Sequence, residues 1–136
     1  MLGYVFDDTV LVSLGGGDHG PGALLAALDN RDIRVCIPAV TLSYVFAVLS
    51  PQRCVELLGI IEAMPNAAVE PLSDGVAALE LAEFVELVPG DASAAHALAA
   101  ARKQEMEIIT VDRGRWRRVE EELSFAVPLV ELTDED

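Results

Sequence analysis

The sequence is poor in basic residues, aromatic residues and cysteine. Lysine and arginine together number 9 against 23 acidic residues, and the formal net charge at pH 7 is −14. Nucleic-acid backbones are held mainly by lysine and arginine, so this balance argues against a broad nucleic-acid-binding surface and leaves room only for a small basic patch. With 52% hydrophobic and only 5% aromatic residues, the composition is typical of a soluble globular protein rich in alanine, valine and leucine.

Two further absences narrow the class of protein. Cys36 and Cys54 lack CxxC spacing, so we expect reduced core residues of a cytosolic protein, with no disulfide and no metal knuckle. No uninterrupted apolar run approaches the ~20 residues of a membrane span, and no basic segment precedes an apolar stretch as in a signal peptide. We therefore expect a cytoplasmic protein with no membrane partner.

Short apolar segments alternate with helical patterns along the chain. We expect a single domain over residues 1–132 and an acidic tail over 133–136. Strands are predicted at 3–6, 33–37, 67–70, 107–111 and 127–132. Helices are predicted at 10–14, 23–28, 40–49, 51–64 and from 73 or 74 to 88. A further helix begins at 91, before the fourth strand, and a short helix after that strand covers the arginine-rich segment up to 123. The glycine-rich segment 15–22 reads as a loop without the GK[ST] of a phosphate-binding loop. This alternation predicts a three-layer α/β/α sandwich with a central, mainly parallel sheet of about five strands.

Three aspartates stand at the ends of these predicted elements. Asp7 follows the first strand, Asp112 follows the strand at 107–111, and Asp91 begins the helix before that strand. Carboxyl ends of parallel strands open into the crevice where α/β proteins bind ligands. Neighbouring carboxylates repel unless a cation lies between them, and hard oxygen ligands favour Mg²⁺ or Mn²⁺. Taken alone, each aspartate is first interpreted as a helix cap or turn residue, and the sequence does not decide whether the three converge.

Arginines cluster directly after Asp112. Four of the nine basic residues lie within six positions around Trp116. Arg113, Arg115 and Arg117 could form the small basic patch that the composition allows, where they would contact RNA if the family resemblance described below holds, with Trp116 as a platform on which a base could stack. The alternatives are that Trp116 is a core anchor and that the arginines pair with nearby glutamates, at spacings such as Arg117 to Glu121. His96 is expected to be a helix-surface or packing residue, and neither it nor His19 is assigned a functional role.

Three stretches together resemble a known family. They are YVFDDTVLVSL (4–14), VCIPAVTLSYVFAVL (35–49) and DASAAHALAAARKQEMEIITVD (91–112). They look like the landmark regions of PIN domains, the metal-dependent nuclease fold that includes the toxins of VapBC-type toxin–antitoxin pairs. The resemblance covers essentially the whole chain in element order and is sharpest at Ile108 to Asp112.

This resemblance implies an activity and a set of site residues. Asp7, Asp91 and Asp112 would hold Mg²⁺ or Mn²⁺ and cleave single-stranded RNA, with the hydroxyls of Thr9 and Thr110 beside them. The implied partners are RNA and a cognate antitoxin, and we further expect a homodimer.

The chain departs from the family pattern at Tyr44. Active members usually carry a glutamate at this position, and no acid occurs between Ile33 and Val55. The departure supports a second hypothesis, a catalytically degenerate PIN-like binding or scaffolding protein. Asp8 is not expected to replace the missing acid, because on an extended strand its side chain would point away from that of Asp7. A phosphoacceptor domain is a third hypothesis, disfavoured because the only lysine, Lys103, does not follow a late strand.

Overall fold

The structure is a computed structural model that describes residues 2–133. Except for Thr133, the predicted acidic tail therefore lies outside the described residues. The strands are β1 (Gly3–Phe6), β2 (Arg34–Pro38), β3 (Ala67–Glu70), β4 (Glu107–Thr110) and β5 (Leu129–Glu131). The helices are α1 (Asp8–Gly15), α2 (His19–Asn30), α3 (Ala39–Val48), α4 (Pro51–Ala63), α5 (Gly75–Leu87), α6 (Ala92–Gln104), the 3₁₀ turn η1 (Arg113–Trp116) and α7 (Arg117–Glu122).

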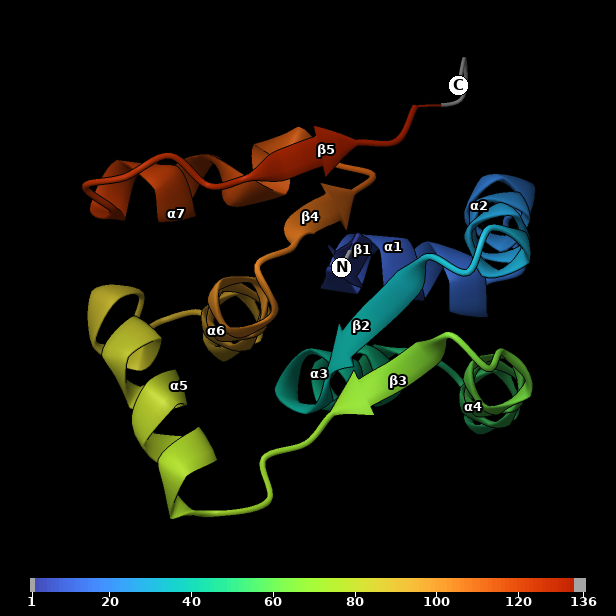
Figure 1. Cartoon of the computed structure of the whole chain (residues 1–136), viewed down its shortest axis with the longest axis horizontal. Coiled ribbons are helices and arrows are strands. Elements are labelled where there is room, and N and C mark those ends of the chain that lie inside the picture. Colours follow the sequence, from blue (N-terminus) through green and yellow to red (C-terminus); the bar gives the residue numbers. More distant parts are fainter. Residues whose placement is uncertain (1, 134–136) are drawn as a thin grey trace.

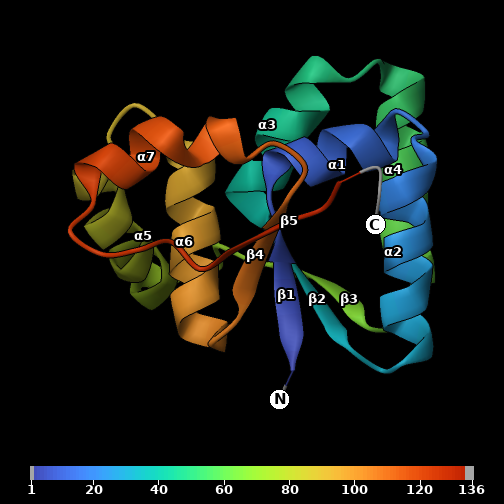
Figure 2. The same ribbon diagram turned by 90° about the horizontal axis from the view of Figure 1, so that it is seen from above.

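The five strands form one all-parallel sheet in the order β3-β2-β1-β4-β5. Helices α5, α6 and α7 lie on one side of it, and α1, α2 and α4 on the other (Figures 1 and 2). Successive strand residues face opposite sides, so Val5 and Ile108 join one apolar cluster while Phe6 and Ile109 join the other. The predicted three-layer α/β/α fold is confirmed.

The central strand β1 places the candidate site. It pairs with β2 on one side and with β4 on the other, Phe6 lying opposite Ile109. The chain leaves β1 into α1 on one face of the sheet and reaches β4 from α6 on the other. The strand order therefore reverses beside β1, and the crevice beyond the ends of β1 and β4 is where open parallel sheets bind ligands.

Helices α4 and α5 each begin after a residue whose side chain caps them. Ser50 accepts a hydrogen bond from the Arg53 N–H ahead of Pro51 and begins α4, and Asp74 does the same for the Ala77 N–H at the start of α5. A side-chain oxygen at this position satisfies a backbone donor that the helix itself leaves free.

Two predictions around α1 were wrong. The helix predicted at 10–14 begins at Asp8, because the Asp7 carboxylate accepts from the Val10 N–H and caps α1. The segment 15–22 is not a continuous loop, since α1 extends to Gly15 and α2 begins at His19. Gly17, with φ of 86°, makes the left-handed turn between the two helices, and three residues suffice to connect them.

No helix within residues 2–133 combines the length and apolar character required to cross a bilayer. Both cysteines are free thiols, and Cys36 is buried in the sheet.

Candidate functional site

Asp7 is buried and fully hydrogen-bonded. Its side chain is 1% exposed. Oδ1 accepts from the Thr9 hydroxyl at 2.6 Å and the Val10 N–H at 3.0 Å, and Oδ2 accepts from the Trp116 indole N–H at 2.8 Å. Burial raises the pKa of Asp7, an effect that the hydrogen bonds with Thr110, Thr9 and Trp116 only partly offset. Asp7 therefore caps α1 and anchors η1 at once.

The two predicted hydroxyl positions lie beside Asp7 and join the ends of β1 and β4. The Thr9 and Thr110 hydroxyl oxygens are 3.0 Å apart. Thr9 also accepts from the Val111 N–H at 3.0 Å, and Thr110 accepts from the Asp112 N–H at 3.2 Å. A chain of short polar contacts thus joins the segments that follow the carboxyl ends of the two strands.

Arg115 lies between two carboxylates, those of Asp8 and Asp91. Its Nε and Nη2 donate to Oδ1 and Oδ2 of Asp8 at 2.9 and 2.8 Å. Its Nη1 and Nη2 donate to Oδ2 and Oδ1 of Asp91 at 2.6 and 2.8 Å. We call this arrangement the Arg115 clamp. Two forked arginine–carboxylate contacts on one guanidinium are strong and geometrically specific.

The electrostatics of the clamp follow from this geometry. Burial by itself would raise the pKa of Asp91, but hydrogen bonds from Arg115 and the Ala94 N–H, together with the charge of Arg115, hold it below its usual range. The same two carboxylates raise the pKa of Arg115 against the opposing effect of burial. The Arg115 side chain is 16% exposed and lies over the Trp116 ring at 5.1 Å. The ion pairs are therefore partly shielded from solvent, and Asp91 and Arg115 stay charged near neutral pH.

Asp112 is set apart from the clamp. Its side chain is exposed, and Oδ1 accepts from the Gly114 N–H at 3.0 Å, which makes Asp112 the cap of η1. Arg113 and Arg117, predicted to contact RNA, are exposed on η1 and α7. Trp116 is fully buried, which favours its reading as a core anchor over a stacking platform.

The three predicted metal ligands lie near the carboxyl ends of the strands, but they do not converge on one shared centre. Asp7 lies with Thr9 and Thr110, Asp91 lies with Asp8 and Arg115, and Asp112 lies at the rim. Among residues 2–133, no three His, Cys, Asp or Glu side chains are grouped so that they could hold a metal ion. Both oxygens of Asp7 and of Asp91 already accept hydrogen bonds, so this donor set as arranged does not fit the predicted Mg²⁺ or Mn²⁺.

Asp8 is the residue that the sequence reasoning missed. The expectation that its side chain points away from the site assumed an extended strand, whereas Asp8 is the first residue of α1. An aspartate directly after an apolar strand is itself a helix cap, and a second acid in the first helical turn suits the helix dipole. The pair Asp7–Asp8 therefore indicates a helix that starts at Asp8, two residues before the predicted start at residue 10.

An open groove of about 810 Å³ runs beside these acids between α1 and α3. Its apolar side chains include Val12, Tyr44 and Val48, which are 37%, 55% and 71% exposed. Asp18 and Asp112 are among the acids that line it. We call it the Tyr44 groove. The position at which the sequence departs from the family's glutamate thus lines the same groove as Asp112.

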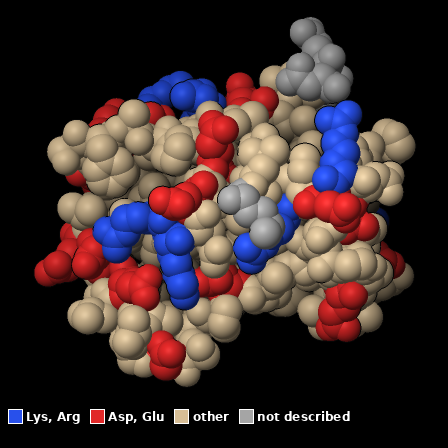
Figure 3. All heavy atoms as spheres, in the orientation of Figure 1, with Lys and Arg blue, Asp and Glu red and all other residues tan. Residues whose placement is uncertain are grey.

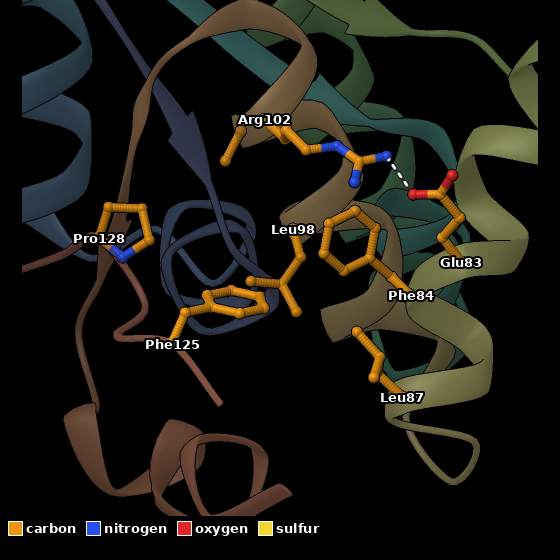
Figure 4. A pocket seen from close by; sticks show the side chains of 8 residues that line it. Glu83, Phe84, Leu87, Leu98, Arg102, Phe125 and Pro128 are labelled. Carbon is orange, nitrogen blue, oxygen red and sulfur yellow. Dashed lines mark ion pairs between the residues drawn. The ribbon is translucent and has the colours of Figure 1, made fainter. Parts of the chain in front are cut away.

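A second, smaller cavity of about 370 Å³ is bordered by α5, α6 and the segment before β5 (Figure 4). Phe84 and Leu87 of α5, Leu98 of α6 and the loop residue Phe125 line it, and the ion pair between Arg102 and Glu83 stands at its edge. The Arg102 guanidinium lies over the Phe84 ring at 4.6 Å. This cavity is predominantly apolar and holds none of the predicted site residues.

Charge on the face shown in Figure 3 is mixed. Groups of lysine and arginine atoms are separated from one another and stand next to acidic atoms, so this face carries no continuous basic surface.

Comparison with protein-family models gives no match for this chain, and comparison with curated proteins gives none either.

Proposed function

We propose that this chain is a PIN-like domain that binds a protein partner through the Tyr44 groove and does not cleave RNA. The observation that carries the proposal is the exposure of Tyr44 and Val48 in an apolar groove next to acids that are already engaged. Large apolar side chains gathered in one groove are typical of a surface that a partner covers.

The charge around the groove indicates the chemistry of the partner. Asp18 and Asp112 line it, and the whole chain carries a net charge of −14. A helical segment with one apolar face and a basic face complements this surface, because its apolar side chains would cover Val12, Tyr44 and Val48 while its cations face the acids. A segment of the antitoxin implied by the family resemblance is the partner of this kind that we propose.

A matched pair of valines tests the proposal. Val48 and Val55 are 71% and 72% exposed, but only Val48 lines the groove. The probe is a short fluorescein-labelled model helix with leucine on one face and lysine on the other, titrated with wild type, Val48→Glu and Val55→Glu. We expect Val48→Glu to weaken binding by roughly tenfold or more, since it introduces a charge against the apolar face.

Val55→Glu changes the net charge by the same amount and should bind the peptide like wild type. Equal weakening by both variants would mean that the added charge, and not contact in the groove, changes peptide binding. Either that result or absence of binding to wild type would reject the proposal.

The metal-dependent ribonuclease predicted from the sequence is the alternative hypothesis. It is favoured by the positions of Asp7, Asp91 and Asp112 near the carboxyl ends of the strands. Incubation of wild type with labelled single-stranded RNA and Mn²⁺ separates the two hypotheses. Cleavage that Asp112→Asn abolishes would establish the ribonuclease.

A further inference from the structure

We propose that Arg115 is the resident cation of this acidic crevice: its guanidinium occupies the place between Asp8 and Asp91 that a divalent metal ion would take, and it thereby excludes Mg²⁺ and Mn²⁺. The family resemblance implies a metal ion held by Asp7, Asp91 and Asp112, whereas the structure pairs Asp91 with Asp8 and Arg115. The inference concerns the acids and does not depend on peptide binding in the Tyr44 groove.

The first argument is that the clamp uses every carboxylate oxygen of the pair. Arg115 donates four hydrogen bonds, two to each aspartate. Asp8 Oδ2 also accepts from the Ser93 hydroxyl at 3.1 Å, and Asp91 Oδ1 also accepts from the Ala94 N–H at 3.0 Å. A metal ion would have to displace several charge-assisted hydrogen bonds to reach these oxygens.

The second argument is that Arg115 is held in place from behind. The next residue, Trp116, is fully buried and donates to Asp7, and its ring lies under the Arg115 guanidinium. Asp112 caps the same turn through the Gly114 N–H. Because the turn is anchored at both ends, the guanidinium is a tethered cation at a high effective concentration, and a free ion must compete with it.

The third argument concerns the charge balance. Asp8 and Asp91 bring two negative charges into a partly buried place, where like charges repel strongly. A planar guanidinium satisfies both carboxylates at once, which a lysine ammonium does not do because it lacks the rigid fork. Arg115 reduces the net charge of the group from −2 to −1 and gives all four carboxylate oxygens a hydrogen bond. Without it, the same two aspartates, with the Ser93 hydroxyl beside them, are oxygen donors of the kind that Mn²⁺ binds.

The test is a Mn²⁺ titration of four proteins by calorimetry and thermal unfolding, with the metal alone as the probe. Wild type should show no saturable binding into the millimolar range and no shift in Tm. Arg115→Met keeps much of the side-chain volume but removes the charge, so it should gain one Mn²⁺ site at least tenfold tighter than any in wild type, and its Tm should rise with Mn²⁺. Arg115→Met with Asp91→Asn should lose that site.

Arg113→Met is the matched control, because Arg113 lies on the same turn with an exposed side chain outside the clamp. It should respond to Mn²⁺ like wild type. If Arg115→Met does not fold, Arg115→Lys replaces it. Its single ammonium cannot make both forks, so Mn²⁺ should displace it and raise the Tm.

Two results would overturn the inference. One is a Mn²⁺ site in wild type as tight as that of the Arg115 variants, and the other is a folded Arg115→Met or Arg115→Lys protein that gains none. Neither result bears on peptide binding, which the comparison of Val48→Glu with Val55→Glu decides separately.

Discussion

Asp7 and Trp116 form a buried pair in which one carboxylate satisfies donors from two elements. Their hydrogen bond joins residues 109 positions apart and ties η1 to the start of α1. The raised pKa of Asp7 shows that its charged form is disfavoured by burial and is kept largely by these donors. A change to either partner should therefore alter stability in a pH-dependent way.

We predict that Trp116→Phe destabilises the protein by about 1–3 kcal/mol near neutral pH, because a buried carboxylate oxygen loses its indole donor. With a folded pKa above the unfolded one, Asp7 contributes stability that is full at acid pH and is lost as the pH rises through the folded pKa. Losing the donor raises that pKa further, so the deficit of the variant should shrink on acidification. Urea unfolding near neutral pH and at about pH 4.5 measures it.

The control for this prediction is the same substitution in an Asp7→Asn background. There the deficit should not vary with pH, because the titrating group is gone. A deficit that is equal at both pH values in the Asp7 protein would contradict the prediction.

His96 is a second buried polar side chain, and it lies in α6. The prediction of a packing residue is confirmed, since His96 is 4% exposed and its Nδ1 accepts from the Val40 N–H at 3.0 Å. Burial lowers the pKa of His96, opposed by the charge of Glu70 and assisted by that of Lys103. The neutral ring therefore connects α6 to the start of α3.

From this lowered pKa we predict a loss of stability in mild acid. The unfolded chain takes up the proton first, so the contribution of His96 is full above the unfolded pKa of about 6.5 and declines as the pH falls toward the folded pKa. His96→Asn keeps an acceptor for Val40 but does not titrate, so its stability relative to wild type should improve between about pH 7 and pH 5. Urea unfolding of both proteins across this range measures the difference, and parallel curves would contradict the prediction.

At the scale of elements, Asp91 has two separable roles at the start of α6. Its Oδ1 accepts from the Ala94 N–H as a helix cap, and both oxygens bind Arg115. Asparagine caps a helix about as well as aspartate, whereas alanine does not. Comparing the two substitutions therefore separates the cap from the ion pair.

We predict that Asp91→Ala is less stable than Asp91→Asn by about 1 kcal/mol, the ordinary worth of a cap. Asp91→Asn itself should lose about 1.5–3 kcal/mol, because Arg115 gives up hydrogen bonds to a charged partner. The control is Asp74, an exposed cap of α5 that lies outside the Arg115 clamp, where Asp74→Asn should be nearly neutral. Chemical denaturation measures the stability of wild type and of the three variants. Equal losses for Asp91→Asn and Asp74→Asn would mean that the clamp does not stabilise the fold.

At the scale of the whole molecule, helix α5 is notable because more large apolar side chains are exposed on it than on any other helix within residues 2–133. Among its apolar residues Phe84 is buried against α6, while Val76 and Leu79 are 66% and 69% exposed. Figure 1 shows α5 at the outer edge of the helices on its side of the sheet. The homodimer predicted from the sequence would find its most extensive apolar contact here.

We predict that Leu79→Glu shifts this dimer to monomer, because it sets a charge into an apolar contact. Val55→Glu, an equally exposed position on α4, should leave the dimer intact. Added salt should strengthen the wild-type dimer, since each copy carries a net charge of −14. Light scattering coupled to gel filtration measures the mass, and a wild type that is monomeric at all concentrations would contradict the prediction.

Much of the architecture could be predicted because its causes are local. Apolar segments such as Glu107–Thr110 and caps such as Ser50 and Asp74 act within a few residues, so the alternation of strands and helices, and with it the parallel sheet, was readable from the chain. The clustering of aspartates at the carboxyl ends of β1 and β4 follows from that topology.

Only the tertiary structure decided which side chain each aspartate binds. Arg115 lies 107 positions from Asp8 and 24 from Asp91, and the three meet only because η1, α1 and α6 converge beyond the sheet edge. The start of α1 at Asp8 turns that side chain toward the crevice, and the burial of Trp116 fixes Arg115 beside it. No local pattern distinguishes an arginine that faces RNA from one that bridges two carboxylates, because the difference lies in contacts between elements remote in sequence.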